Sequence, residues 1–438
     1  MNYLDLRRKY PVFSYDKFDF SLENNFLIIN FYFSAGEYSF IHKLKINNIE
    51  KTGDQINKYI FNVGLSLIPS YWKPFCSPTI YIKAGSLTKN EIEWWHKLFI
   101  KGMGEYFYKN QIIFTEENFI TLECRNLKAS IAEGTVPPQR DGRREAQSQI
   151  PNSKQILIPV GGGKDSIVTL ELLKSHFDIT AFVINPVPLI SEVIKKADVP
   201  SITVENIFDP KLFELNRNGY LNGHVPVSAF YAFTAVLTAY LRNISYVAFS
   251  NEGGSGEGNT NYLGQEINHQ YSKTLEFETD LNNYLKNITN IKYFSFLRPI
   301  YELQITKIFS QYPQYFDLFS SCNNNFKISN PQQNRWCQNC PKCVSTSLML
   351  ACFTSRETVT KIMGIFPPDL PINKSIIDEL TGKSEVKPFE CVLTRSEAQA
   401  CIEFLNSGHR TKLDRVLNSW QDNPNLPKDF EKILKENI

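Results

Sequence analysis

Hydrophobic and polar positions follow two different patterns along the chain. Residues 18–46 are rich in Phe, Ile and Tyr and are interrupted by Glu-Asn-Asn and Ser-Ala-Gly-Glu, which predicts strands joined by hairpins. From residue 155 onward, short apolar runs alternate with segments in which apolar residues recur at helical spacing. This second pattern is typical of β-α-β units with a parallel sheet, so the expected fold class is α/β.

The N-terminal region is predicted to be an α+β domain. Helices are expected at 54–67 and 87–110, and residues 70–85 between them form a loop that leads into a strand. Thr88 is placed to cap the second helix, because Glu91 follows it three residues later. No motif in this region indicates chemistry. Packing and substrate selection are the alternatives for its role, and packing is favoured.

Composition marks the end of this region. Residues 132–154 contain almost no large apolar side chains and are dominated by Pro, Arg, Gln and Ser, which predicts a linker. The expected division is therefore an N-terminal domain at 1–131, the linker, an α/β domain at 155–310, and a cysteine-rich helical region at 311–438.

The central domain is predicted to alternate strands with helices. Strands are expected at 156–160, 179–185, 201–206 and 246–251, and the helices at 189–196 and 225–242. Ligands of parallel sheets lie beyond the carboxyl ends of the strands, and these ends are polar here. Besides the first strand end, the candidate binding residues at these positions are Asn185, Ser250, Asn251 and Glu252.

A glycine-rich turn after the first of these strands is the most specific motif. It consists of Gly161, Gly162, Gly163, Lys164, Asp165 and Ser166. The backbone N–H groups of such a turn, the following helix N-terminus, the Ser hydroxyl and the Lys charge favour an anion. The spacing fits neither a Walker A loop nor a dinucleotide fingerprint. A tight turn without a ligand is the alternative, and three consecutive glycines disfavour it.

Residues 250–260 form a second glycine-rich segment, in which Glu252 or Glu257 is expected to hold Mg²⁺ through oxygen. A flexible surface loop is the alternative. A helix over 268–278 would place His269, Lys273 and Glu276 on one face, either as a site or as a solvated face.

Residues 292–309 are predicted to form a strand, a turn and a helix. Arg298 lies near the expected start of that helix, where its guanidinium is placed to meet a carboxylate or a phosphate. Glu302 is placed as an acidic residue of the first helical turn.

Four cysteines form the pattern C-x14-C-x2-C-x2-C: Cys322, Cys337, Cys340 and Cys343. This spacing suits a closed, structural Zn²⁺ site; an iron–sulfur cluster and a packed, metal-free turn stay open. Residues 344–438 are predicted to be helical apart from 387–391, where Cys391 is expected to be a buried small hydrophobe, with a thiol acid/base as the alternative.

The composition of the chain indicates its class of protein, its partners and its location. The chain has 438 residues, 42% hydrophobic and 21% charged, with a net charge of +2, which is ordinary for a globular protein and gives no basis for a nucleic-acid partner. It contains no apolar run long enough for a membrane span and no secretory leader pattern. Nine cysteines with four clustered favour a reducing compartment, so the expected location is the cytoplasm, without a membrane partner. The oligomeric state stays open.

Motifs in the sequence resemble those of two groups of enzymes. The glycine turn resembles the SGGxDS loop of N-type ATP pyrophosphatases, with Gly161 in place of the first Ser. Taken in order, GGGKDS, SNEGGSGEGN, NHQYSK, LRPIYELQI, SCN, WCQNCPKCV and KPFEC resemble segments of the ATP-dependent UDP-N-acetylmuramoyl-L-alanyl-L-glutamate epimerases of peptidoglycan synthesis. SYWKPFCSP at 70–78 and the helix with Trp94 and Trp95 extend the resemblance into the N-terminal domain.

The resemblance implies an adenine-nucleotide α-hydrolase-like domain that uses ATP and Mg²⁺. The enzyme would adenylylate the terminal glutamate of a UDP-linked muramoyl dipeptide, release diphosphate, invert the α-carbon and release AMP. The 161–166 turn would bind phosphates, and Lys164 and Arg298 would offset the charge of the transferring group. The base for the α-proton is left open among His269, Lys273 and Cys391.

Three other functions stay open. A synthase of the 7-cyano-7-deazaguanine type also combines the pyrophosphate loop with a cysteine cluster. An RNA-modifying adenylyltransferase is disfavoured by the small net charge. An ATP-sensing regulator without turnover is the non-enzyme alternative, and AMP formation would exclude it.

Overall fold

The computed structural model describes residues 1–124, 152–326 and 335–438, which form two compact units. Unit 1 comprises Met1–Gln155, Ile202–Tyr246 and Asn283–Lys292, and unit 2 comprises Ile156–Ser201, Val247–Asn282 and Tyr293–Ile438. Residues 132–151 of the predicted linker lie outside the described residues. The linear division into domains stays a prediction.

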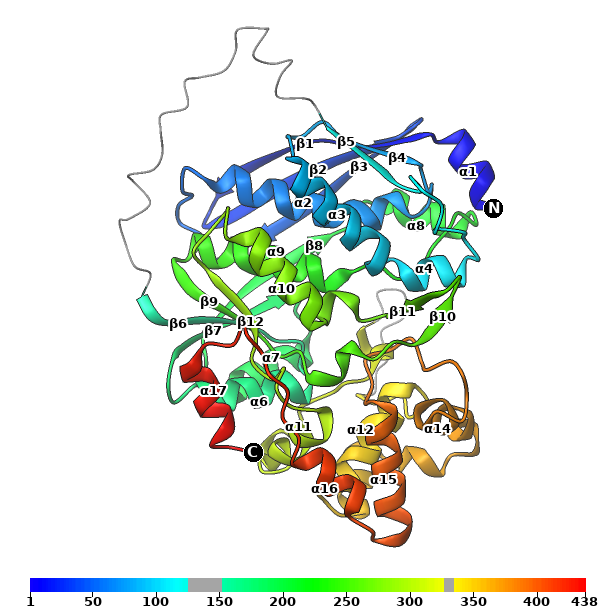
Figure 1. The fold of residues 1–438 in the computed structure, drawn as a ribbon. Coiled ribbons are helices and arrows are strands. Elements are labelled where there is room, and N and C mark those ends of the chain that lie inside the picture. The colour runs from blue at the N-terminus through cyan, green and yellow to red at the C-terminus, as the bar shows by residue number, and fades with distance from the viewer. Residues whose placement is uncertain (125–151, 327–334) are drawn as a thin grey trace, which may run out of the picture. The chain divides into compact units, whose positions relative to one another are not determined.

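Unit 1 contains a mixed sheet with helices (Figure 1). Its neighbouring strands are ordered β8-β3-β2-β1-β4-β5. Their bounds are β1 Val12–Glu23, β2 Phe26–Ala35, β3 Tyr38–Ile46, β4 Thr79–Ile82, β5 Thr121–Cys124 and β8 Ser201–Ile207. The helices are α1 Tyr3–Lys9, α2 Ile56–Trp72, α3 Lys89–Gly102, α4 Gly104–Lys109, α8 Pro210–Arg217 and α9 Val227–Leu241.

The predicted hairpins of unit 1 are confirmed. β1 and β2 pair antiparallel up to Glu23 and Phe26, and the two residues between them, Asn24 and Asn25, both have positive φ. Such a turn matches the twist of the flanking strands, and Asn tolerates it well. β2 then buries every second side chain, so that its apolar face enters the core.

Two predicted helices of unit 1 have different bounds. The helix expected at 87–110 is divided at Met103 into α3 and α4, because Gly102 and Gly104 flank Met103 and have low helix propensity. Its predicted capping box at Thr88 is present. The helix expected at 54–67 continues to Trp72, so the start of the predicted 70–85 loop is helical. This last turn is stabilised because its aromatic side chains are buried in unit 1.

Unit 2 contains strands that alternate with helices. Its strands are β6 Asn152–Pro159, β7 Asp178–Ile184, β9 Ile244–Phe249 and β12 Lys292–Ser295, in the order β12-β9-β6-β7, and a separate pair, β10 Thr260–Tyr262 and β11 Gln265–Ile267. Its helices are α6 Lys164–Leu173, α7 Pro188–Ala197, α10 Leu275–Leu285, α11 Glu302–Phe309, α12 Pro341–Ala351, α13 Arg356–Met363, α14 Lys374–Thr381, α15 Arg395–Ser407, α16 Thr411–Leu417 and α17 Lys428–Lys435. The predicted alternation of strand and helix is confirmed.

Backbone hydrogen bonds show how the strands of unit 2 run. Val160 N–H, just after β6, donates to the Phe182 carbonyl near the end of β7, at 2.9 Å. Phe296 N–H, just after β12, donates to the Phe249 carbonyl at the end of β9, at 2.8 Å. Each bond joins two carboxyl ends, so the paired strands are parallel. The predicted α/β class is therefore confirmed, and the ends of these strands share one edge.

The C-terminal helices of unit 2 enclose a core of their own. α12, α14, α15 and α16 surround it in Figure 1. Its buried members include Leu303, Val344, Leu348, Leu393 and Leu413. The core holds the starts of α11, α12 and α15 together. Among the described residues, no helix has both the length and the apolar character needed to cross a membrane.

Candidate functional site

The glycine turn lies at the carboxyl end of β6, as predicted. Gly162 has φ +80°, a left-handed conformation that side chains with a Cβ disfavour, and its carbonyl accepts a hydrogen bond from Ser320 N–H at 3.1 Å. Gly163 is the N-cap of α6, and no side chain caps this helix. α6 begins at Lys164, so Lys164, Asp165 and Ser166 form its first turn, whose N–H groups have no intrahelical partners.

Replacing Gly162 with alanine is expected to lower the free energy of unfolding of unit 2 by about 1–2 kcal/mol, the cost of a left-handed L-residue. The matched control is Gly161→Ala, because a Cβ at Gly161 meets no atom within 4 Å and its φ is not in that range. Urea or thermal unfolding of the two variants measures the difference. Equal midpoints would contradict a conformational requirement at Gly162.

Lys164 forms the centre of a buried charge group. Its side chain is 2% exposed, and its ammonium donates to Asp165 Oδ1 at 2.6 Å and to Glu302 Oε2 at 2.7 Å. Burial opposes the charge, yet the two carboxylates raise the pKa of Lys164 above its usual value. Burial likewise opposes the charge on Glu302, but Lys164 holds the pKa of that carboxyl at about 2. Glu302 was missed as a site residue because a first-turn acid is common in any helix.

Glu252, after β9, is a buried carboxyl group beside this charge group. Among the described residues no donor reaches its Oε2 atom, and the residue is 6% exposed. Burial, with the negative charges of Glu302 and Glu397, raises the pKa of Glu252 to about 8. Without a positive partner the buried group therefore stays mostly protonated at neutral pH, and a bound cation is the kind of partner that would stabilise its ionised form.

The second glycine-rich segment is ordered through Glu257. Lys387 Nζ contacts Glu257 Oε2 at 2.5 Å, and Arg395 N–H donates to the same carboxylate at 3.2 Å. The alternative of a flexible loop is wrong for this part of the segment. Because Glu257 already has these partners, Glu252 is the better oxygen ligand of the two.

The remaining predicted binding residues lie at the same strand ends. Asn185 follows β7 directly and has φ +51°. Ser250 Oγ donates to Thr169 Oγ1 of α6 at 2.8 Å, and the Asn251 side chain donates to Ser295 Oγ at 3.0 Å. The Ser166 hydroxyl donates to the Gly163 carbonyl at 3.0 Å.

Arg298 connects several segments of unit 2. Its guanidinium, 2% exposed, donates to the Glu252 carbonyl at 2.6 Å, to Ser255 Oγ at 2.5 Å and to the Lys273 carbonyl. It also pairs with Glu278 at 3.5 Å. Both terminal nitrogens thus have protein partners, an arrangement that favours a positioning role for Arg298.

The helix predicted over 268–278 is wrong. β11 ends at Ile267, a short 3-10 turn covers Tyr271–Lys273, and α10 starts at Leu275. The Thr274 hydroxyl accepts from Phe277 N–H at 3.1 Å, which starts the helix there. Lys273 nevertheless reaches a second candidate: its ammonium lies 3.0 Å from Cys391 Sγ.

Cys391 is also hydrogen-bonded by the His269 side chain, so all three candidate bases converge. The expectation that Cys391 is a small hydrophobe is wrong, because it is half-buried and contacts an ammonium group. Sequence spacing gave no signal for this contact, since 118 residues separate the partners.

The four clustered cysteines come together as predicted. Their sulfur atoms all lie within 4.8 Å of one another, with Cys340 and Cys343 at 3.5 Å and Cys337 and Cys343 at 3.8 Å. Four thiolates around a tetrahedral Zn²⁺, at about 2.3 Å each, lie about 3.8 Å apart, so the donor set fits this ion. Cys340 occupies the N-cap position of α12 and Cys343 lies in its first turn, so this helix start positions the last two ligands.

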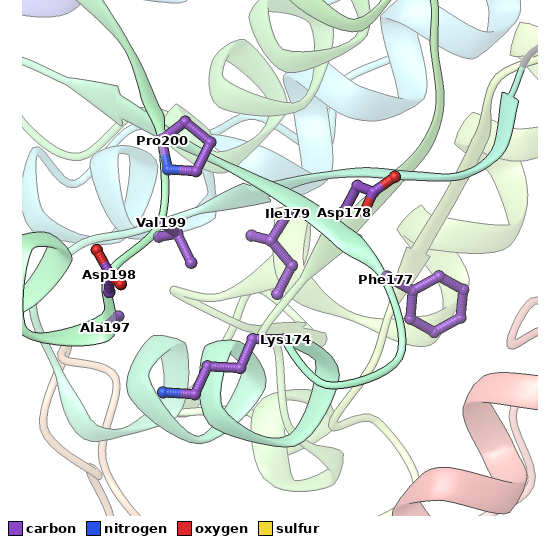
Figure 2. A pocket seen from close by; sticks show the side chains of 8 residues that line it. All are labelled: Lys174, Phe177, Asp178, Ile179, Ala197, Asp198, Val199 and Pro200. Carbon is purple, nitrogen blue, oxygen red and sulfur yellow. The ribbon is translucent and has the colours of Figure 1, made fainter.

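A pocket in unit 2 lies away from these residues. Figure 2 shows it between Lys174 at the end of α6, Asp178 at the start of β7 and Pro200 after α7. It is therefore at the amino ends of the strands, whereas ligands of parallel sheets bind at the carboxyl ends.

Comparisons with known proteins cover most of the chain. The family described as the MurL N-terminal domain matches residues 5–296, and that described as the MurL C-terminal domain matches residues 318–432. No solved structure matches the chain.

Three curated relatives carry the name UDP-N-acetyl-alpha-D-muramoyl-L-alanyl-L-glutamate epimerase. The one from Micromonospora sp. is 37% identical over 70% of this chain and 66% of its own length. Those from Salinispora tropica and Xanthomonas oryzae pv. oryzae are 34% and 31% identical, over 75% and 80% of this chain and 66% and 75% of their own lengths. The chain thus spans just under two thirds of the length of the first two relatives.

Proposed function

Because the chain belongs to the MurL family, we propose that it converts the terminal L-Glu of UDP-MurNAc-L-Ala-L-Glu to D-Glu at the expense of ATP. The reaction passes through an acyl adenylate and releases diphosphate and AMP. The observation that carries the proposal is the uncapped glycine turn before α6, together with buried Lys164 and the unpartnered Glu252 carboxylate next to it.

The first half of the reaction takes place at the strand ends of an adenine-nucleotide α-hydrolase-like domain. Backbone N–H groups after Gly161 and at the start of α6 bind the phosphates of ATP. The Ser166 hydroxyl joins them by turning from the Gly163 carbonyl to a phosphate oxygen. Asn185, Ser250 and Asn251 lie at the adjoining strand ends and contact the nucleoside. Lys164 offsets negative charge that develops as the α-phosphate is transferred.

Mg²⁺ fits the acidic side of this site. Glu252 and Asp165 are its expected ligands, since the negative charge of Asp165 acts on Glu252 and oxygen is the ligand that Mg²⁺ prefers. The bound ion would neutralise phosphate charge. Arg298 holds the Glu252 and Lys273 segments in place through their carbonyl groups rather than touching the phosphates.

Activation of the carboxylate explains why an epimerase needs ATP. A carbanion next to a free carboxylate is disfavoured by the negative charge already present, whereas the acyl adenylate accepts the electron pair into a neutral carbonyl group. A base then removes the α-proton, the opposite face is protonated, and water releases AMP. The proposed substrate is therefore a UDP-linked muramoyl dipeptide. Because the reaction uses ATP, the proposed location of the protein is the cytoplasm. Neither a nucleic acid nor a membrane is needed as partner.

The test is to incubate the protein with Mg-ATP and UDP-MurNAc-L-Ala-L-Glu, and to measure AMP and the configuration of glutamate after acid hydrolysis. AMP together with D-Glu is the expected result. If the wild-type protein releases AMP but forms no D-Glu, it is an adenylylating enzyme that acts on another acid, as a synthase of the 7-cyano-7-deazaguanine type does. Absence of AMP with any acid would favour an ATP-sensing regulator. A gel shift with tRNA would favour the RNA-modifying alternative.

A further inference from the structure

A thiol and an ammonium group form a close pair in unit 2. Cys391 lies in the segment between α14 and α15, and its Sγ is 3.0 Å from Lys273 Nζ. Lys273 is held in place by its own carbonyl, which accepts from Ser255 Oγ at 3.0 Å and from Arg298. The pair is therefore positioned by the same contacts that fix the Glu252 segment.

The surroundings favour a thiolate at Cys391. Burial opposes the negative charge, but Lys273, the hydrogen bond from His269 and the more distant Lys342 lower the pKa of the thiol to about 5. The Cys391 charge in turn raises the pKa of Lys273 above its usual value, against the effect of burial. Glu390 also faces this group and adds a negative charge to Cys391's surroundings. At neutral pH the pair is thus thiolate and ammonium.

This ion pair belongs to the site around the glycine turn. Lys273 interacts electrostatically with Glu252 and Asp165 as well as with Cys391. The buried Oε2 of Glu252 is the atom that no donor reaches among the described residues. A thiolate paired with an ammonium group is a reactive arrangement, whereas an inert cysteine sits among apolar side chains.

We propose that Cys391 is the base that removes the α-proton of the activated glutamate, an inference that rests on the proposed function. Of the three candidates, Lys273 is protonated and has no lone pair, and His269 hydrogen-bonds the Cys391 side chain. The other two candidates thus both stabilise negative charge on the Cys391 sulfur, which as a thiolate carries the electron pair that accepts the proton. Lys273 is the positioning residue that keeps it ionised.

The proton transfers balance without any additional reagent. The Cys391 thiolate takes the proton from the α-carbon, and the C–H electron pair moves into the acyl carbonyl to give an enolate. A water molecule on the opposite face protonates the α-carbon, and the hydroxide that it leaves takes the proton from the Cys391 thiol. The thiolate is restored, and the configuration of the carbon is inverted.

The test separates activation from proton transfer. Cys391→Ala and Cys391→Ser are incubated in D₂O with Mg-ATP and UDP-MurNAc-L-Ala-L-Glu, and AMP is measured beside deuterium at the glutamate α-carbon. We expect both variants to release AMP by hydrolysis of the adenylate but to lose deuterium incorporation and D-Glu at least about 100-fold, the contribution of a general base. Cys124→Ala, a half-buried cysteine of unit 1, is the matched control.

Each other outcome contradicts the inference. Deuterium incorporation within about threefold of wild type in either variant would exclude Cys391 as the base. Loss of AMP in step with loss of deuterium would assign Cys391 to activation instead. If the wild-type protein itself releases no AMP, the proposed function is wrong. This outcome differs from a wrong assignment of Cys391, which would show only in the variants.

Lys273 gives a second, independent readout. Loss of its charge in Lys273→Met removes the largest effect that favours the thiolate, so the pKa of Cys391 rises from about 5 toward that of an ordinary thiol. The thiolate form of Cys391 then exists only at higher pH. In a profile of deuterium incorporation against pH, the acidic limb, where incorporation falls, is expected to shift to higher pH by two or more units, about 100-fold in proton concentration. Lys273→Arg keeps the charge and is expected to keep the limb. An unmoved limb in Lys273→Met would overturn the role of the pair.

Discussion

Asp165→Asn is expected to reduce substrate-dependent AMP release at least about 100-fold while the protein keeps its fold, in line with the loss of one group that stabilises transition-state charge. The Asp165 side chain is 30% exposed, whereas those of Lys164 and Glu302 are 2% and 5% exposed. Asp165 is thus the member of the charge group that can reach a ligand. Its carboxylate is the proposed contact with the magnesium ion on the phosphates.

Asp165→Asn preserves the shape of the side chain, and Lys164 keeps its second carboxylate partner at 2.7 Å. The cost in stability therefore combines a lost carboxylate near the N-terminus of α6, about 0.3–1 kcal/mol, with the loss of the Asp165 charge that pairs with Lys164 at 2.6 Å. Asp178→Asn is the matched control, because Asp178 is an exposed aspartate at the amino end of β7. AMP release is measured at saturating ATP and substrate, and the unfolding midpoint is measured beside it. Wild-type turnover in Asp165→Asn would contradict the assignment of the phosphate site to this turn.

The charge group also shows what the sequence could and could not predict. The hairpin at Asn24 and Asn25, the glycine turn and the alternation of strands and helices depend on neighbouring residues, so local patterns identified them. The contact of Lys164 with Glu302 spans 138 residues. It depends on which helix follows which strand in the sheet, and no spacing in the sequence encodes that distance.

The errors have a similar origin. A helix over 268–278 satisfies the helical spacing of His269, Lys273 and Glu276, but the Thr274 hydroxyl caps a helix that starts later. Cys391 was predicted to be apolar because a lone cysteine is most often a small buried hydrophobe. Its ammonium neighbour becomes visible only when the loop before α15 is placed next to the turn at Lys273. In both places the observed structure depends on contacts that the local sequence pattern does not contain.

The cysteine cluster lies at the start of a helix that packs against the segments of the candidate site. Cys340 is the residue just before α12, and Cys343 lies in the first turn of this helix. α12 places Val344 and Leu348 in the core that also contains Leu303 and Leu393. Leu303 follows Glu302, and Leu393 lies two residues after Cys391. A metal at the four sulfurs would therefore fix the start of a helix that packs with the residues next to Glu302 and near Cys391.

We accordingly expect about one zinc per chain by elemental analysis, and none in Cys343→Ser. Removing the metal, by chelation or by this substitution, is expected to lower the unfolding midpoint by at least about 10 °C, because structural zinc supplies several kcal/mol and each is worth about 2–4 °C in a unit of this size. The proposed epimerase activity is expected to fall with it, since the segments of Glu302 and Cys391 lose their common support. Cys124→Ala, outside the cluster, is expected to keep both metal and midpoint. Iron with visible absorbance in place of zinc would favour an iron–sulfur cluster, and a metal-free protein with an unchanged midpoint would contradict a metal site of either kind.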